Sequence, residues 1–258
     1  MELQKHFVAY IDILGFSKYI KDNLQTPEKP LELLQQFIGI FKELQLSDKL
    51  DIFAFSDNIV VSMLAEEQSP QSDHLEIWKF IYYINALQIY VISMIGILPI
   101  RGGISYGDFY HNGSEILFGD AMIQAYDYER LHAFFPRIVV IPKFLDPNNY
   151  MTAHKNLAAM GLPIKLPEYN PEQLKRQYPV AYDYDSMLYC NYLSALFSKG
   201  KRVNYSDDAL NKHKIFIVSN LQQEDMSVLR KYAWMKSYHN WFCRPFAEFQ
   251  KFIIQDCK

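Results

Sequence analysis

The chain has 258 residues, half of them apolar, and a formal net charge of −3 at neutral pH. This composition excludes a disordered tail, and the lack of clustered Lys and Arg argues against a protein that coats nucleic acid, so no nucleic-acid partner is expected. The three cysteines are too few and too scattered for a disulfide framework, which indicates a protein of the reducing cytoplasm.

Hydrophobic patterning predicts alternating strands and helices as far as residue 141. In chain order we expect a strand at 6–15, a turn and a helix opening near Ser17, a helix at 31–46, a hairpin at 52–64, a helix at 73–95, a strand at 100–110, a short strand ending at Phe118, a helix at 120–134 and a strand at 137–141. This is an α+β order in which an antiparallel hairpin lies beside the first strand, as in ferredoxin-like palms.

The apolar stretch 77–98 raises the question of a membrane span. It contains Lys79, Asn85 and Gln88 and lacks a basic flank, so we interpret it as a buried helix and expect no membrane partner.

Beyond residue 141 the sequence changes character. Six of the twelve prolines lie between Pro142 and Pro179, which is typical of loops. Aromatic residues after Met226 have helical spacing, interrupted at Pro245, and indicate either a helix with its own core or a dimer contact. We therefore expect a core at 1–141 and a loop-rich and helical extension at 142–258 that completes the same domain.

Two aspartates lie within apolar, strand-like runs: Asp12 in 7–16 and Asp57 in 52–61. A carboxylate in such a run is costly unless it is paired or binds a metal. If the strand 6–15 lies beside the hairpin, both carboxylates reach one end of the sheet, where they can bind one or two Mg²⁺ or Mn²⁺ ions. The alternatives are a cap or turn role for Asp12 and ordinary hairpin-turn chemistry for Asp57.

The helix that opens near Phe16 and Ser17 would direct backbone N–H groups at a polyphosphate beside those metals. A pair of metal ions would clamp the attacking and leaving oxygens of a phosphoryl transfer. The seven histidines show no metal-ligand spacing, and neither a Gly-x-Ser-x-Gly elbow nor a phosphate-binding Gly-Lys-Ser/Thr loop is present.

Four sequence blocks, in this order, resemble the class III nucleotide cyclases. They are Tyr10-Ile-Asp-Ile-Leu-Gly-Phe16, Phe55-Ser-Asp-Asn58, Arg101-Gly-Gly-Ile-Ser-Tyr-Gly107 and Gly119-Asp-Ala-Met-Ile-Gln-Ala125, and they cover about half of the chain. The first three look most like the pyrimidine cyclases of the Pycsar antiphage system. The resemblance implies a class III cyclase palm and a homodimer with composite active sites. It also implies a cyclic product sensed by a separate effector.

The resemblance also implies roles for individual residues. Asp12, Asp57 and the Ile13 backbone carbonyl would bind Mn²⁺ or Mg²⁺, and the nucleotide would lie against Gly15, Phe16 and Ser17. Phe53 falls where purine-specific cyclases place a base-reading lysine, which agrees with a pyrimidine substrate. Its alternative role is that of a plain core residue. Family frequency, rather than any residue here, favours UTP over CTP.

One departure from the family concerns the transition state. Ile123 and Asp127 occupy the positions of an Asn and an Arg that steady the transition state in purine cyclases, so another cation must act there. Arg101 is the first candidate for this catalytic role, although it is equally a strand residue that pairs with Asp108 or Asp120.

Several alternatives stay open at this point. Arg130 of a partner subunit is a second candidate for the missing cation. The five glycines between residues 102 and 119 mark either close backbone approach or simple turns. The chain is interpreted as a uridylate cyclase, with a cytidylate cyclase, a purine or unspecific cyclase and a catalytically inactive nucleotide-binding module as the other possibilities.

Overall fold

The computed structural model describes residues 2–43, 50–65, 72–113, 116–141, 171–198 and 201–255. The first part of the chain contains β1 (Gln4–Ile13), α1 (Phe16–Asp22), α2 (Glu28–Glu43), β2 (Leu50–Phe55), β3 (Asn58–Leu64), α3 (Ser72–Met94), β4 (Ile100–His111), β5 (Leu117–Phe118), α4 (Asp120–His132) and β6 (Ile138–Val140). The predicted order of elements up to residue 141 is confirmed, and α2 begins three residues earlier than the sequence pattern indicated.

The C-terminal part adds further strands and helices. It contains α6 (Pro171–Gln177), β7 (Val180–Tyr182), β8 (Leu188–Cys190), η2 (Tyr192–Leu196), β9 (Phe197–Ser198), β10 (Lys201–Arg202), α7 (Ser206–Asn220), α8 (Met226–Cys243) and η3 (Ala247–Phe252). Residues 142–170, most of the proline-rich stretch, lie outside the described residues, so the loop character expected there stays a prediction.

The main sheet has the strand order β2-β3-β1-β4-β6-β8-β7, with β5 paired to β4. The β4–β6 pair is parallel and the other pairs are antiparallel. The order β2-β3-β1-β4, with helices between β1 and β2 and between β3 and β4, is the split βαβ arrangement of ferredoxin-like folds. The predicted α+β class is therefore confirmed, and β7 and β8 of the C-terminal part extend the same sheet.

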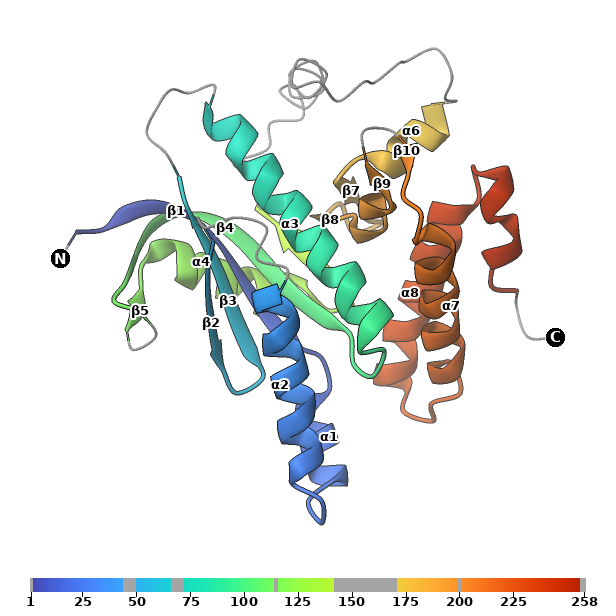
Figure 1. The fold of residues 1–258 in the computed structure, drawn as a ribbon, viewed down its shortest axis with the longest axis horizontal. Helices are drawn as coiled ribbons and strands as arrows, with labels where there is room; N and C mark the ends of the chain where they lie inside the picture. Colours follow the sequence, from blue (N-terminus) through green and yellow to red (C-terminus); the bar gives the residue numbers. More distant parts are fainter. Residues whose placement is uncertain are drawn as a thin grey trace.

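Alternation along β1 assigns its side chains to two layers. Phe7, Ala9, Ile11 and Ile13 lie in the core that includes α2 and α3. Val8 and Tyr10 point to the opposite face, toward Ala121 and Ala125 of α4. Helices α3 and α4 thus cover opposite faces of the sheet (Figure 1). Asp12 continues the series of Val8 and Tyr10.

Two glycines explain how closely α4 and β1 approach β4. A Cβ atom at Gly102 would clash with the Tyr10 backbone, and one at Gly103 would clash with the Ala125 carbonyl. The prediction of close backbone approach is confirmed at these positions, and α4 consequently lies directly against the strand that carries Arg101.

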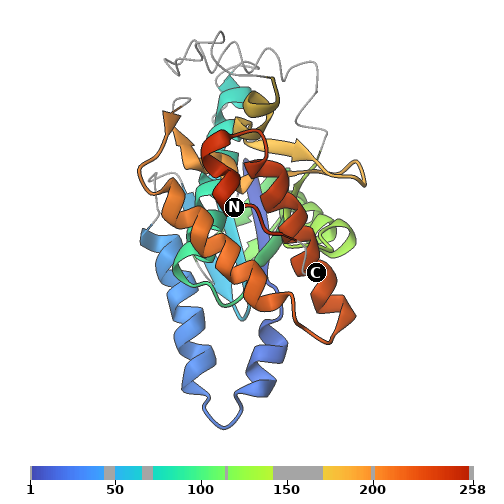
Figure 2. The same cartoon turned by 90° about the vertical axis from the view of Figure 1, so that its right-hand side faces the viewer.

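A second core lies between α3 and the C-terminal helices. Ile89 and Ile92 of α3 contact buried aromatic residues from η2, α7, α8 and η3. Figure 2 shows α7 and α8 side by side on this flank of the molecule. Helix α8 ends at Cys243 and η3 begins at Ala247, on either side of Pro245, as the sequence predicted. The aromatic helix therefore packs in a core of its own chain.

Within the described part of the chain, no helix is long and apolar enough to cross a membrane. Helix α3, the segment in question, is buried along most of its length, and Asn85 and Gln88 donate hydrogen bonds to the Pro179 and Pro136 carbonyls. The interpretation of this segment as a buried helix is confirmed.

Candidate active site

Asp12 and Asp57 lie at the same end of the sheet, as the sequence predicted. Asp12 is opposite Asn58 in the β1–β3 ladder, and the Ile13 N–H donates a 3.0 Å hydrogen bond to the Asp57 carbonyl. Asp57 belongs to the turn between β2 and β3, in which Ser56 has a φ of 57°. This left-handed conformation is uncommon for serine and is often found in tight turns at functional positions. Their role as metal ligands stays a prediction.

Arg101 of β4 connects Asp12 to α4. Its Nε donates to Asp12 Oδ2 at 2.8 Å, and its Nη2 forms a 2.9 Å ion pair with Glu129 Oε1. The guanidinium also donates to the Ala133 carbonyl at 3.3 Å. The predicted pairing with Asp108 or Asp120 is wrong, because β1–β4 register places Arg101 opposite Asp12.

The two carboxylates expected as partners of Arg101 are engaged elsewhere. Asp108 forms a 2.8 Å ion pair with Lys5, and Asp120 accepts a hydrogen bond from Gln124 one turn later in α4. Both lie toward the other end of β4, so neither charge is available to Arg101.

The ion-pair network of Arg101 is partly buried, and this burial changes the pKa of neighbouring groups. Burial raises the pKa of the Glu129 carboxyl, the charge of Arg101 lowers it, and the nearby Asp12 carboxylate raises it again. Burial, with the charges of Glu129, Asp12 and Asp57, raises the pKa of Tyr10 to about 12. Three carboxylates therefore act on one tyrosine, which indicates a locally negative site that favours cations.

The turn predicted to face phosphate follows β1 directly. Gly15 has a φ of 88°, a conformation that favours glycine, and α1 begins at Phe16 without a side-chain cap on its first turn. The Phe16 side chain is buried in the main core, whereas Ser17 is exposed. Any contact between Phe16 and a nucleotide would therefore involve its backbone.

Phe53 lies on the same face of the sheet as Tyr10 and is buried with it. Its ring is 5.0 Å from that of His111, which in turn lies 3.3 Å from Asp51. This position agrees with the plain core role that was one of its two alternatives, and base recognition by Phe53 stays a prediction.

The two positions that depart from the cyclase pattern lie on the outer side of α4. Ile123 is exposed, and Asp127 is 3.6 Å from Arg130. Neither contacts Asp12 through a described interaction. Arg130 is exposed and is therefore free to face a partner subunit.

The donor set fits a hard divalent cation. The described residues contain no group of three or more His, Cys, Asp or Glu side chains placed to bind a metal, so the chain offers two carboxylates and backbone carbonyls. Mg²⁺ and Mn²⁺ accept oxygen ligands, and Mg²⁺ typically uses one or two carboxylates together with water and substrate phosphates. The site therefore suits a cation that arrives with a phosphorylated substrate.

Sequence reasoning missed Glu129 and Lys231. Ala121, Ala125 and Glu129 are buried at a four-residue spacing on α4, and that spacing was the available signal for Glu129. Lys231 of α8 lies close enough for the charges of Arg101 and Asp12 to act on its pKa. Because it is more than two hundred residues from Asp12, no local pattern could have indicated it.

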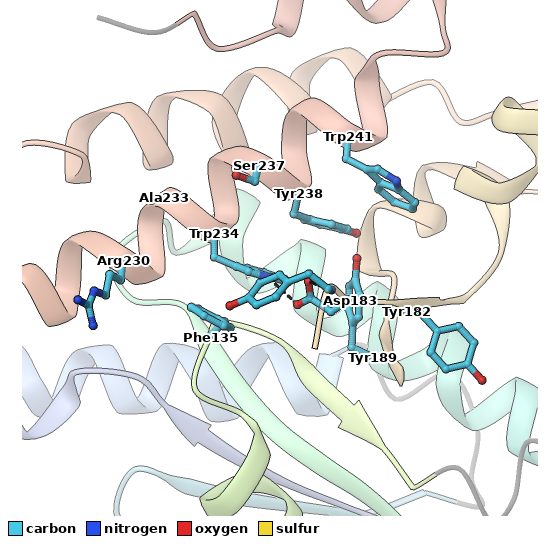
Figure 3. A pocket seen from close by; sticks show the side chains of 11 residues that line it. Phe135, Tyr182, Asp183, Tyr189, Arg230, Ala233, Trp234, Ser237, Tyr238 and Trp241 are labelled. Carbon is cyan, nitrogen blue, oxygen red and sulfur yellow. Dashed lines mark hydrogen bonds between the residues drawn. The ribbon is translucent and has the colours of Figure 1, made fainter. Parts of the chain in front are cut away.

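A large concavity lies elsewhere, between α8 and the β7–β8 hairpin. This cavity of about 660 Å³ is lined mainly by aromatic residues, with Arg230 at one end of the α8 face and Trp241 at the other (Figure 3). The rings of Phe135, Trp234, Tyr238 and Trp241 stack in sequence, with interplanar angles of 12°, 8° and 22°.

Comparison with known proteins gives a limited likeness. No family model matches the sequence, and no curated protein matches it. Among solved structures, the chain is similar to the adenylyl cyclase CyaB from P. aeruginosa, with 17% identity over 61% of this chain and 84% of that one and a TM-score of 0.45. The chain is also similar to the guanylyl cyclase Cya2, with 18% identity over 56% of this chain and 78% of that one and a TM-score of 0.39. A bacterial light-regulated adenylyl cyclase is 14% identical over 81% of this chain and 96% of that one, with a TM-score of 0.41. Identities and TM-scores of this size do not establish a family or an activity.

Proposed function

We propose that the protein is a nucleotidyl cyclase that converts UTP to 3′,5′-cyclic UMP and pyrophosphate. The observation that carries the proposal is the hydrogen bond from Ile13 N–H to the Asp57 carbonyl, together with the Asp12–Asn58 register. These contacts bring two carboxylates from different elements to one end of the sheet. The ordered sequence blocks around them supply the choice of reaction.

In the proposed reaction the 3′-hydroxyl attacks the α-phosphate in line. The bond between O3′ and the α-phosphorus forms, and the bond between the α-phosphorus and the oxygen that bridges to the β-phosphate breaks, so that pyrophosphate leaves. The proton of the hydroxyl passes to solvent water. Asp12 and Asp57 would hold Mn²⁺ or Mg²⁺, which when bound lowers the pKa of the hydroxyl and neutralises phosphate charge. Arg101 orients the Asp12 carboxylate, and the backbone N–H groups from Gly15 to Ser17 face the phosphates.

The choice of a pyrimidine rests on Phe53 and on sequence resemblance. The phenyl ring of Phe53 has no hydrogen-bonding group with which to read a purine edge. This argument does not distinguish the two pyrimidines, so a cytidylate cyclase fits as well as a uridylate cyclase. We further propose a cytoplasmic homodimer in antiphage defence, whose product activates a separate effector. The exposed apolar side chains of Ile123, Tyr126 and Phe134 in and just after α4 support an interface on that side.

A specific observation favours a second candidate, an inactive nucleotide-binding module. Arg101 is held by Asp12, Glu129 and the Ala133 carbonyl, so its donors are largely occupied. Ile123 and Asp127 occupy the two positions of α4 at which purine cyclases have the Asn and Arg that stabilise the transition state. The chain therefore lacks an evident cation for the transition state at these positions.

Incubation of the protein with each of the four ribonucleoside triphosphates and Mn²⁺, followed by identification of the product, tests these proposals. We expect the wild-type chain to form cyclic UMP and pyrophosphate from UTP, and the Asp57→Asn variant to form no cyclic product. Cyclic CMP would support the cytidylate alternative, and cyclic AMP or cyclic GMP would overturn the pyrimidine assignment. No turnover with nucleotide binding intact would support the inactive module.

A further inference from the structure

The first turns of helix α8 lie near two parts of the candidate site, namely α1 and the segment that follows α4. The turn between α7 and α8 and Lys18 of α1 line a common polar cavity of about 460 Å³. Hydrogen bonds from Ser227 lower the pKa of Asp225 at the start of α8, and the charge of Lys18 makes a smaller contribution in the same direction. About two and a half turns further along α8, Trp234 stacks on Phe135 with ring centroids 5.9 Å apart (Figure 3). Phe135 follows closely after Ala133, whose carbonyl accepts from Arg101. These contacts confine residues 225–234 between the α1 turn and the Arg101 network.

Lys231 occupies the middle of this confined segment. Its side chain is half-buried, and within the described ranges no hydrogen bond and no carboxylate within ion-pair distance engages its ammonium group. Burial and the charge of Arg101 lower its pKa, whereas Asp225 and Asp12 raise it. A half-buried ammonium group with unused donors is costly unless an anion completes it.

The charge balance of the site indicates which anion. A nucleoside triphosphate brings about four negative charges to a place that already contains Asp12, Asp57 and Glu129. Arg101 is tied to two of these carboxylates and to a carbonyl. Lys18 is exposed. Among the described cations named here, Lys231 is therefore the one that combines partial burial with donors that no described residue engages.

We propose that Lys231 binds the phosphates of the nucleotide held at Asp12 and Asp57 of the same chain. This inference rests on the proposed function and assigns a role to the C-terminal helices, because α8 then forms one wall of the triphosphate site. The lysine acts as a compact point charge that can follow the phosphates as charge moves toward pyrophosphate. It supplies in cis the positive charge that α4 lacks at Ile123 and Asp127.

The test compares Lys231→Met, which keeps the length of the side chain, with Arg230→Gln, which removes the adjacent, exposed charge. Binding of 3′-deoxyuridine 5′-triphosphate and of 3′-deoxyuridine is measured by calorimetry, first with chelator and then with Mn²⁺. We expect Lys231→Met to weaken triphosphate binding by about 10- to 100-fold in both buffers. Nucleoside binding and the midpoint of thermal unfolding should not change, and Lys231→Arg should restore most of the affinity.

Equal losses in Lys231→Met and Arg230→Gln would overturn the inference, since they would indicate a general effect of net charge. Unchanged affinity and turnover in Lys231→Met would also overturn it and would leave the proposed cyclase intact. If the wild-type chain binds the triphosphate but forms no cyclic product, the cyclase proposal fails, while a selective loss in Lys231→Met still supports the contact. If the wild-type chain does not bind the triphosphate, both proposals are overturned.

Discussion

Arg101 and Arg137 are each held between two carboxylates, and the difference between them separates structure from function in this molecule. The Arg137 side chain is fully buried between Asp183 and Asp185, and it also donates to the His132 carbonyl. The Arg101 side chain is 27% exposed, and its partner Asp12 is 17% exposed. Arg137 thus belongs to a buried network that joins β6 to the β7–β8 hairpin, in which its Nη1 and Nη2 atoms are paired and its Nε has no partner among the described residues. Arg101, in contrast, is partly accessible to solvent and to a ligand.

A network around two histidines resembles that of Arg137. His239 Nε2 lies 3.0 Å from the Phe252 carbonyl, which only accepts, so this nitrogen carries the hydrogen. His239 Nδ1 must then accept from His213 Nδ1 at 2.9 Å, and His213 Nε2 must accept from the Tyr192 hydroxyl at 2.9 Å. Each donor has an acceptor within the chain, so these histidines need no ligand to satisfy their ring nitrogens.

The largest expected effect of a single substitution on stability is at Arg137. Arg137→Leu leaves two carboxylates without their partner, and removal of one side of a buried ion pair typically costs about 3–5 kcal/mol. Trp234 donates to Asp183 at 2.7 Å, so the loss should extend to the packing of α8. Urea unfolding of the wild type and Arg137→Leu measures this. A change below about 1 kcal/mol, the range of exposed pairs, would contradict the contrast drawn with Arg101.

The paired histidines predict a dependence of stability on pH. Burial lowers the pKa of His239 to about 4, and burial together with the neighbouring His239 lowers the pKa of His213 well below its ordinary value. The unfolded chain therefore takes up protons first as the pH falls. Stability from these groups is complete above about pH 6.5 and is lost toward pH 4, by about 1.4 kcal/mol per pH unit for each histidine.

Urea midpoints between pH 7.5 and pH 4.5 measure this loss. His132→Gln removes a less buried histidine and serves as the control, which should show the same slope as the wild type. A flat profile between pH 6.5 and pH 5 would mean that the histidines are not buried in neutral form.

Arg101 should give the smallest change in stability and a distinct change in binding. Because the pKa of Glu129 is already raised by burial, this carboxyl can take up a proton when Arg101 is removed, and we expect Arg101→Met to cost about 1 kcal/mol. Removing the guanidinium also frees Asp12, so Mn²⁺ should bind more tightly in the absence of nucleotide. A stability loss as large as that of Arg137→Leu would make Arg101 a structural residue.

The sequence predicted more of the fold than of the site. Alternating patterns and glycine turns identified the elements up to residue 141 because these signals are local. They also located Asp12 and Asp57, since a carboxylate within an apolar run is unusual wherever it occurs. The partners of Arg101 depend on the register between β1 and β4, and Lys231 depends on the packing of α8 against distant elements. Neither the register between β1 and β4 nor the packing of α8 produces a recognisable pattern within a short segment of sequence.

The most direct test of the metal site is the binding of Mn²⁺ with 3′-deoxyuridine 5′-triphosphate, which cannot cyclise. Electron paramagnetic resonance measures free Mn²⁺ for the wild type, Asp12→Asn, Asp57→Asn and the control Asp127→Asn, which removes a carboxylate from the outer side of α4. We predict that both site variants lose the tight Mn²⁺ binding while the control keeps it. Retention of tight binding in both site variants would contradict the assignment of Asp12 and Asp57 as the metal ligands.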